Sequence, residues 1–490
     1  MITASKPRSR DRRGLRGLIL GLVVVGAIVA AQERPDRSRP PALAPPPPLH
    51  LPSIDKRTLR NGLAVWVVES HEVPVIQIAL VVRAGAGDDP AGKYGAASLT
   101  SAMLDEGAGA RSALQIADAI EFLGATLTTT SSFDASAVRL NVPVDGLDDA
   151  LPVLADVALR PTFPGDDIER LRKERLTALL QARDDPPSIA AMAFARVVFG
   201  AMHRYGAGTV GTEAALNALS AQDLRTFHAA YYQPSNATFV VVGDISADAV
   251  VPRLEKYFGD WQPAVPFTRR ASVPSAPQLT SRQTYLIDKP DAEQSQIRIG
   301  WVGVPRSTPD YFSLVVLNTV LGGSFTSRLN QNLREQHGYA YGASSAFDMR
   351  LSTGPFVAAA GVQSDKTADA IREFFNELNG IGMPIAADEL AKARNYIALG
   401  FPAEFETSTD LSRRLEELIV YGLGDDYFER YVPNVLAVTT ERVSQAAARY
   451  VQPSRFAVVV VGDRATIEPG IRALNLGPVR ILSVDEALGR

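Results

Sequence analysis

Apolar residues recur along the chain with two periods, one typical of strands and one typical of helices. Runs of β-branched and apolar residues bounded by glycine, proline or asparagine predict strands. These runs follow the Asn61-Gly62 turn and recur at 75–83, 126–130, 137–142, 237–242, 283–287, 296–302 and 456–461. Apolar residues three and four apart predict helices at 96–104, 112–123, 147–159, 164–182, 188–199, 212–219, 311–321, 324–336, 367–378, 387–399, 410–421 and 441–450. Strands and helices interleave without strict alternation, which favours an α+β fold over a doubly wound parallel sheet.

One phrase occurs twice. Gln-Pro-Ser at residues 233–235 leads into a strand and then Gly-Asp at 243–244, and Gln-Pro-Ser at 452–454 leads into a strand and then Gly-Asp at 462–463. Both parts of the phrase are displaced by the same 219 residues, and each copy follows a helical segment. Two phrases in register indicate an internal duplication.

Proline-rich segments mark the boundaries of the duplicated halves. Residues 32–52 contain a run of four consecutive prolines and predict an extended linker. We predict an N-terminal half at 53–262, a second proline-rich linker at 263–281 and a C-terminal half at 282–490.

Composition narrows the possible chemistry. The 490-residue chain is 46% hydrophobic, so it can bury a substantial core. A net charge of −4 without a basic domain argues against a nucleic-acid partner. The chain has no cysteine, which excludes disulfides, thiolate metal sites and cysteine nucleophiles.

The N-terminal residues 1–31 predict a cleaved signal peptide. Basic residues come first, and the uncharged run 18–31 ends in Val29-Ala30-Ala31, where a signal peptidase finds small residues. A run of about 14 residues spans roughly 21 Å as a helix, less than the hydrocarbon core of about 30 Å, so cleavage is favoured over a permanent membrane anchor. We expect an exported protein, periplasmic in a bacterium with two membranes.

The stretch 321–342 combines a glycine turn, a short amphipathic helix and two polar side chains beyond it. Gly322 and Gly323 form the turn, and Ser324 or Thr326 can cap the helix, which Gly338 ends in a left-handed turn. Arg334 then leaves the last helical turn and Tyr341 leaves the following extended run, so both side chains can converge on one ligand. The alternative is that Arg334 pairs with Glu335 or Asp348 and that Tyr341 is an ordinary strand aromatic.

These phrases, in this order, resemble the M16 peptidases, which include the pitrilysin and insulinase-like zinc metallopeptidases and the mitochondrial processing peptidase subunits. The resemblance covers about residues 55–470. It is carried by Asn61-Gly62-Leu63, the segment 92–97, Asp184-Asp185-Pro186, Phe199-Gly200, the segment 203–206, both Gln-Pro-Ser phrases and the stretch 322–341. The resemblance implies duplicated halves, each of two α+β units with an antiparallel sheet covered by helices.

The family's zinc motif is degenerate in this chain. In active members, a helix carries His-x-x-Glu-His, whose histidines bind zinc and whose glutamate activates water, and a glutamate on a later helix completes the site. At the matching positions this chain has Ser98, Ser101 and Ala102, and no acid at 177–180; Glu174 lies about a turn earlier. We therefore expect no catalytic metal and no independent peptidase activity in this chain.

No other side chains rebuild a catalytic site. The five histidines include no i, i+4 pair, and Ser98 and Ser101 lack the base and nucleophile elbow that serine chemistry requires. They are interpreted as small residues on a closely packed helix. His203 is interpreted as a hydrogen-bonded structural histidine.

The resemblance gives Arg334 and Tyr341 a role. In active members, an Arg and a Tyr seven residues later reach the zinc site, hold the substrate backbone and stabilise the oxyanion. Gly322, Gly323 and Ser324, beside them, are candidate substrate-binding residues. Some bacterial members divide the site between a zinc-binding chain and a chain with the Arg/Tyr pair. This chain resembles the second kind: a non-zinc subunit of a heterodimer that acts on peptide or unfolded protein, with zinc in the partner. The alternative is a catalytically silent structural or peptide-holding protein.

Overall fold

The computed structural model describes residues 51–268 and 273–489. The predicted signal peptide at 1–31, and all of the linker at 32–52 except its last two residues, lie outside the described part of the chain. None of the helices in the described residues is long and apolar enough to span a membrane.

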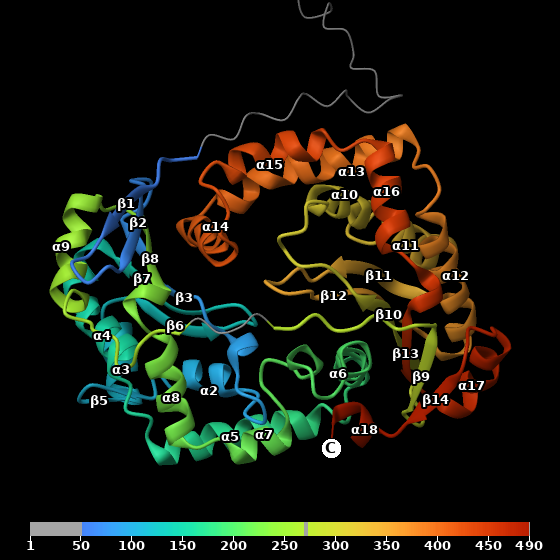
Figure 1. The fold of residues 1–490 in the computed structure, drawn as a ribbon, viewed down its shortest axis with the longest axis horizontal. Coiled ribbons are helices and arrows are strands. Elements are labelled where there is room, and N and C mark those ends of the chain that lie inside the picture. The colour runs from blue at the N-terminus through green and yellow to red at the C-terminus, as the bar shows by residue number, and fades with distance from the viewer. Residues whose placement is uncertain (1–50, 269–272, 490) are drawn as a thin grey trace, which may run out of the picture. The chain divides into compact units, whose positions relative to one another are not determined.

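The described part of each half is built around one six-stranded sheet (Figure 1). The N-terminal sheet has the order β1 (Asp55–Thr58), β2 (Ala64–Glu69), β8 (Ala237–Gly243), β3 (Val75–Val82), β7 (Ser136–Pro143) and β6 (Thr126–Ser131). The C-terminal sheet has the order β11 (Ala340–Phe347), β12 (Pro355–Gln363), β10 (Gln294–Val302), β13 (Ala457–Gly462), β9 (Gln283–Asp288) and β14 (Val479–Leu482). The short strands β4 (Gly107–Ala108) and β5 (Arg111–Ser112) pair separately.

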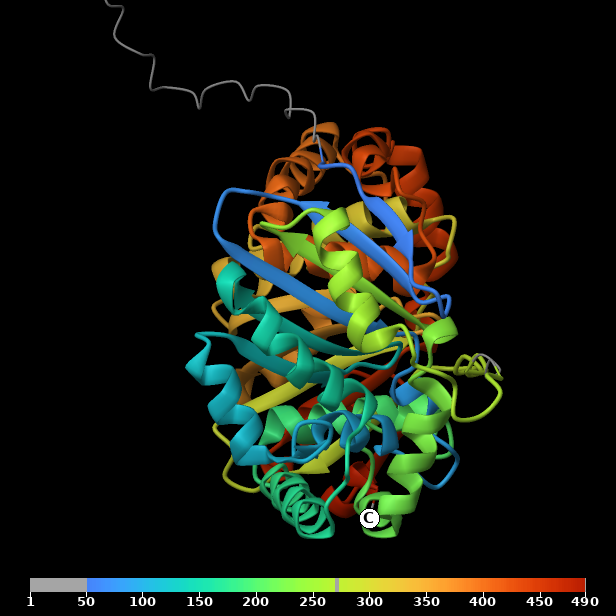
Figure 2. The same cartoon turned by 90° about the vertical axis from the view of Figure 1, so that its left-hand side faces the viewer.

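Helices surround both sheets. The N-terminal half contributes α2 (Ala96–Ala102), α3 (Ala113–Phe122), α4 (Leu147–Leu159), α5 (Gly165–Gln181), α6 (Pro186–Phe199), α7 (Glu213–Ala218), α8 (Ala221–Tyr231) and α9 (Ala247–Phe258). The C-terminal half contributes α10 (Tyr311–Leu321), α11 (Arg328–Asn330), the π-helical turn η5 (Gln331–Gln336), α12 (Thr367–Gly380), α13 (Ala387–Gly400), α14 (Ser408–Tyr421), α15 (Tyr427–Leu436), α16 (Thr440–Tyr450), α17 (Arg464–Ala473) and α18 (Val484–Leu488). Figure 2 shows helices of the N-terminal half lying over one face of its sheet.

Strand register confirms the duplication. Ala64 on β2 pairs with Thr238 on β8, and Gln283 on β9 pairs with Ala457 on β13, so both partners are displaced by 219 residues. The α+β class and the duplicated halves are therefore as expected. Each half contains one sheet, whereas two α+β units per half were expected. The reason is that β8 and β13, which come late in each half, pair beside β2 and β9 and so join the strands of that half into a single sheet. These pairs are also parallel, so the sheets are mostly rather than wholly antiparallel.

The two halves exchange one helix each. Helix α6 of the N-terminal half packs on β10 and β13, and helix α14 of the C-terminal half packs on β3 and β8 (Figure 1). The contact is close: a Cβ built on Gly300 of β10 would lie 2.8 Å from Cζ of Phe194 on α6. Each half therefore covers an apolar sheet face of the other, which buries surface that neither half could bury alone.

Two local predictions differ from the structure. The helix expected at 324–336 begins only at Arg328 and continues as the π-helical turn, because Ser324 Oγ donates its hydrogen bond back to Thr319 O (3.2 Å) instead of capping a helix. Pro186 and Pro187 begin α6 rather than only ending α5, since proline is compatible with a first helical turn. Gly338 has φ +66°, which confirms the predicted left-handed turn.

Candidate functional site

Arg334 and Tyr341 come from two irregular pieces of backbone. Arg334 lies in the turn η5, whose hydrogen bonds are of the π-helical type. Tyr341 lies on the outermost strand β11, where the register against β12 shifts between Ala340 and Ala343. Such π-helical turns and strand bulges are concentrated at functional sites, where they redirect side chains. The side chain of Tyr341 is 91% exposed.

The structure brings the predicted pair together. The guanidinium carbon of Arg334 lies 5.3 Å from the ring centre of Tyr341, within cation–π distance. Arg334 Nε also lies 3.3 Å from Glu335, one of the two alternative partners, whereas Asp348 binds Arg350. The contact with Glu335 is solvent-exposed and worth little energy. Within the described residues, Nη1 and Nη2 of Arg334 donate no hydrogen bond. These two donors are therefore available to a ligand.

Phe325 and Asn330 also belong to this site, and the sequence alone did not identify them. Phe325 is 60% exposed, and the centre of its ring lies 4.5 Å from the guanidinium carbon of Arg334. The buried Asn330 side chain donates to Phe325 O (2.9 Å) and accepts from the Ala343 N–H (3.0 Å). One amide thus ties the loop of Phe325 to the strand of Tyr341. A signal for Phe325 exists in the sequence, as the one large apolar residue in an otherwise small and polar loop.

The candidate substrate-binding residues Gly322, Gly323 and Ser324 attach this loop to the fold. Gly322 O accepts from the Ser345 N–H (3.0 Å), and a Cβ on Gly322 would lie 2.4 Å from that nitrogen. A Cβ on Gly323 would lie 2.6 Å from Nδ2 of Asn318. These contacts explain why the turn requires glycine. Substrate binding by these three residues stays a prediction.

The residues expected to occupy the positions of the family's zinc motif lie together on α2 of the N-terminal half. Ser98 and Ala102 are half-buried and Ser101 is buried. Arg175 of α5 donates to Ser98 O (2.9 Å), and burial lowers the pKa of Arg175 to about 10. Hydroxyl and methyl groups next to a guanidinium do not fit zinc, which needs imidazole or carboxylate ligands. Glu174 binds Arg170 instead (3.0 Å), and no group of three His, Asp or Glu side chains in the described residues could hold a metal.

The segment 203–206 is linked to the start of α2 through Asp89. Arg204 forms a buried ion pair with Asp89 (2.8 Å), and Asp89 accepts from the N–H groups of Gly95 and Ala97 at the start of α2. His203 accepts from the Tyr205 N–H (3.1 Å) and lies 2.7 Å from Pro274 O through its other ring nitrogen. The structural interpretation of His203 is confirmed.

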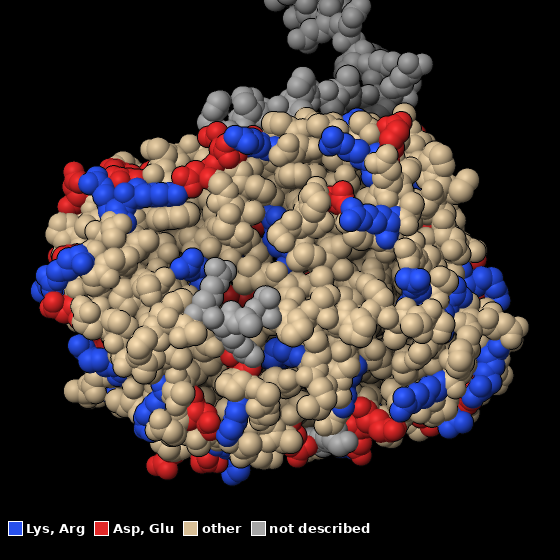
Figure 3. Space-filling model, viewed as in Figure 1, with Lys and Arg blue, Asp and Glu red and all other residues tan. Residues whose placement is uncertain are grey.

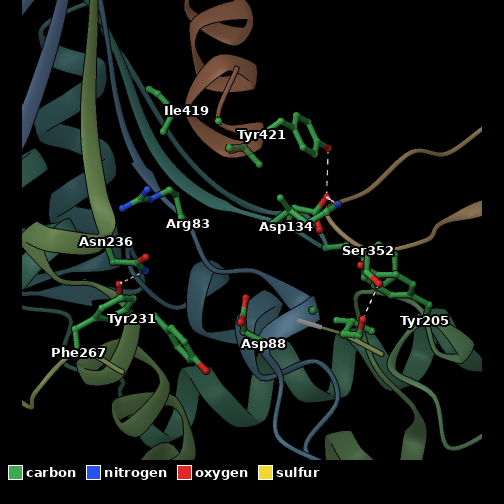
Figure 4. Close-up of a pocket in the computed structure, with 16 residues that line it drawn as sticks. Arg83, Asp88, Asp134, Tyr205, Tyr231, Asn236, Phe267, Ser352, Ile419 and Tyr421 are labelled. Atoms are coloured by element: carbon green, nitrogen blue, oxygen red, sulfur yellow. Dashed lines mark hydrogen bonds between the residues drawn. The ribbon is translucent and has the colours of Figure 1, made fainter. Parts of the chain in front are cut away.

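A pocket of about 510 Å³ lies between the halves (Figure 4). Its polar side is formed around Asp134, which accepts from the Tyr421 hydroxyl (3.2 Å) and the Leu351 N–H (3.0 Å) of the C-terminal half. Burial raises the pKa of Asp134. Figure 3 shows basic and acidic side chains mixed over one face of the molecule, without a patch of a single sign.

Two family models match the chain. One, described as insulinase (peptidase family M16), matches residues 64–200; the other, described as peptidase M16 inactive domain, matches residues 218–397. An uncharacterized zinc protease of Mycobacterium leprae is 28% identical over 433 residues, which are 86% of this chain and 95% of the relative. An uncharacterized zinc protease of Bacillus subtilis is 24% identical over 398 residues, 80% of this chain and 95% of the relative.

Solved structures share the fold. A peptidase M16 inactive domain from Pseudomonas fluorescens superposes with a TM-score of 0.77 at 23% identity, over 84% of this chain and 98% of the other. A protease from Helicobacter pylori superposes with a TM-score of 0.76 at 20% identity, over 84% of this chain and 100% of the other. At these identities the likeness concerns the fold alone.

Proposed function

Since the chain belongs to the M16 peptidase family, we propose that it is the non-zinc subunit of an exported heterodimeric metallopeptidase. In this proposal a partner chain with an intact His-x-x-Glu-His helix binds the zinc, and this chain supplies Arg334 and Tyr341 in trans. The substrate is a peptide or an unfolded protein segment.

One observation carries the proposal. The Arg/Tyr pair is assembled, with an exposed Tyr341 and a half-buried Arg334 whose Nη donors are free, while the matching zinc-motif positions of the same chain hold Ser98, Ser101 and Ala102 beside a guanidinium. A site that kept its oxyanion-binding groups and lost its metal ligands can act only where another chain brings the metal.

The chemistry assigned to the pair follows from its groups. Peptide hydrolysis develops negative charge on the carbonyl oxygen, and donors fixed before the reaction stabilise that charge at no reorganisation cost. Arg334 offers a permanently charged planar fork, and Tyr341 offers a directional hydroxyl donor. Both are attached to backbone that hydrogen bonds hold in place, so they can present their donors to one oxygen atom.

The test combines the purified chain with a zinc-binding M16 chain from the same organism. Cleavage of an unstructured fluorogenic peptide should appear only in the mixture, and a chelator should abolish it. We expect Arg334→Ala and Tyr341→Phe each to lower kcat by about 10²–10³-fold. The matched control is the double variant Arg372→Ala, Tyr396→Phe. It changes two exposed residues on other helices of the C-terminal half and should leave cleavage unchanged.

Two results would reject the assigned role. Undiminished cleavage by the Arg334→Ala, Tyr341→Phe double variant would remove the pair from catalysis. No cleavage by mixtures with any zinc-binding chain of the organism would instead favour the peptide-holding alternative. Export is tested separately, because a mature N-terminus close to residue 32 on the exported protein is expected if the leader is cleaved.

A further inference from the structure

Phe325 is an exposed aromatic residue with a fixed position beside the Arg/Tyr pair. Phe325 is 60% exposed, so its side chain forgoes most of the free energy that burial of a phenylalanine ring would gain. It lies 4.5 Å from the guanidinium carbon of Arg334, and Tyr341 lies 5.3 Å from the same atom. The exposed apolar ring and the exposed phenol therefore both lie within contact range of one half-buried guanidinium.

Hydrogen bonds hold the loop of Phe325 in place. The carbonyl of Phe325 accepts from Asn330, and the same Asn330 amide binds the strand that carries Tyr341. At the other end of the loop, the carbonyl of Gly322 accepts from Ser345 on that strand. Because both ends of the loop are tied to β11, the ring of Phe325 is held near Tyr341 before any ligand binds, which lowers the entropic cost of binding.

The surface is complementary to an extended peptide. The free Nη donors of Arg334 suit a peptide carbonyl oxygen, and Tyr341 adds a hydroxyl donor. An apolar side chain next to that carbonyl would cover the exposed face of the Phe325 ring and remove both apolar surfaces from water. A glycine or serine at that place would leave the ring exposed.

We propose that Phe325 is a specificity-determining residue that contacts an apolar or aromatic side chain of the peptide beside the carbonyl held by Arg334 and Tyr341. The inference rests on the proposed function and adds to it the class of peptide that the site selects.

The test uses the two-chain mixture and two fluorogenic peptides that differ only in whether the residues around the cleaved bond are phenylalanine or alanine. Phe325→Ala should lower kcat/KM for the phenylalanine peptide about tenfold and for the alanine peptide less than about twofold, since one buried apolar contact is worth a factor of this size. Phe325→Leu should restore most of the loss. Phe122→Ala, which removes another exposed phenylalanine on α3, is the matched control and should affect neither peptide.

Each outcome decides between the claims. Equal losses for the two peptides, or no loss, would overturn the role of Phe325 even where Arg334→Ala abolishes cleavage. Where the mixture cleaves nothing, the proposed function fails, and Phe325 is judged by fluorescence anisotropy of the two labelled peptides with this chain alone. Weaker binding of only the phenylalanine peptide by Phe325→Ala supports the inference, and unchanged binding of both peptides contradicts it.

Discussion

Arg139 on β7 and Glu416 on α14 form a bidentate ion pair that joins the two halves of the chain. Nε of Arg139 donates to Oε1 of Glu416 (2.8 Å) and Nη2 donates to Oε2, and the side chains are only 22% and 12% exposed. A second ion pair between the halves, Lys56 with Asp425, lies in solvent at 38% and 60% exposure. The two pairs allow a direct comparison of buried and exposed charge across one interface.

We expect Glu416→Ala to destabilise the fold by about 3 kcal/mol, because the substitution leaves the guanidinium of Arg139 mostly buried without its partner. Asp425→Ala should cost less than about 1 kcal/mol, because its pair is exposed. Urea unfolding followed by circular dichroism measures both. Equal effects of the two substitutions would show that the Arg139–Glu416 pair is not a specific link between the halves.

The exchanged helices predict that the halves unfold together. Phe194 on α6 is 4% exposed and packs against β10, the strand that carries Trp301. Phe194→Ala should cost about 3–5 kcal/mol. The reporter is a chain in which Trp66 and Trp261 are changed to Phe, so that only Trp301 fluoresces. Phe194→Ala should then lower the urea concentration at the midpoint of the Trp301 transition, although Phe194 lies in the N-terminal half. An unchanged Trp301 midpoint would mean that the halves unfold independently.

His228 predicts a loss of stability in acid. It lies between Phe163 and Tyr232, its Nε2 is 2.9 Å from Ala158 O, and burial lowers its pKa to about 4. The unfolded side chain has a pKa near 6.5, so the unfolded state binds the proton first as the pH falls. The contribution of His228 is therefore complete above about pH 6.5 and is lost, up to about 3 kcal/mol, as the pH falls to about 4.

His228→Gln should weaken the dependence of the free energy of unfolding on pH between pH 7 and 4. The measurement compares the free energy of unfolding of the variant with that of the unsubstituted chain across this range. The control is His71→Gln. His71 is exposed, and hydrogen bonds to Asp244 and Glu69 raise its pKa, so its contribution has the opposite sign: present in acid and lost as the pH rises. A His228→Gln profile parallel to the unsubstituted one would contradict the prediction.

Asn330 should control the rigidity of the site. Asn330→Ala removes the hydrogen bonds to Phe325 O and from the Ala343 N–H, so amide hydrogen exchange in residues 340–347 should become faster. Asn330→Asp keeps the acceptor for Ala343 and should have an intermediate effect. Asn376→Ala, at an exposed asparagine on α12, is the control. Unchanged exchange in Asn330→Ala would show that β11 does not depend on this amide.

The purified chain should contain no stoichiometric zinc, and a chelator should leave its thermal unfolding unchanged, because Ser98, Ser101 and Ala102 offer no suitable ligands. Metal analysis and a thermal scan with and without chelator measure both quantities. One bound zinc per chain would show that metal ligands come from side chains other than these.

Much of the fold could be predicted because its signals are local. Residues 147–159 and 311–321 show a helical period throughout, and the structure begins and ends helices α4 and α10 at those residues. The duplication is visible as two phrases in register, and strand pairing displaced by the same number of residues confirms it. The helix expected at 324–336 was partly wrong, because Ser324 donates a local hydrogen bond back to Thr319 O, at the end of the preceding helix, and this bond competes with helix capping.

The sequence by itself determined the α+β class, the duplicated halves and the spacing of Arg334 and Tyr341, and it predicts the loss of zinc ligands at Ser98, Ser101 and Ala102. Only the tertiary structure decided that α6 and α14 are exchanged between the halves, that Arg175 lies beside Ser98, and that Phe325 lies beside Arg334 on a loop that Asn330 ties to β11. The physical reason is distance along the chain. Periodicity and motifs depend on residues that are close together in the sequence, whereas these contacts form between segments that come together only when the whole chain packs.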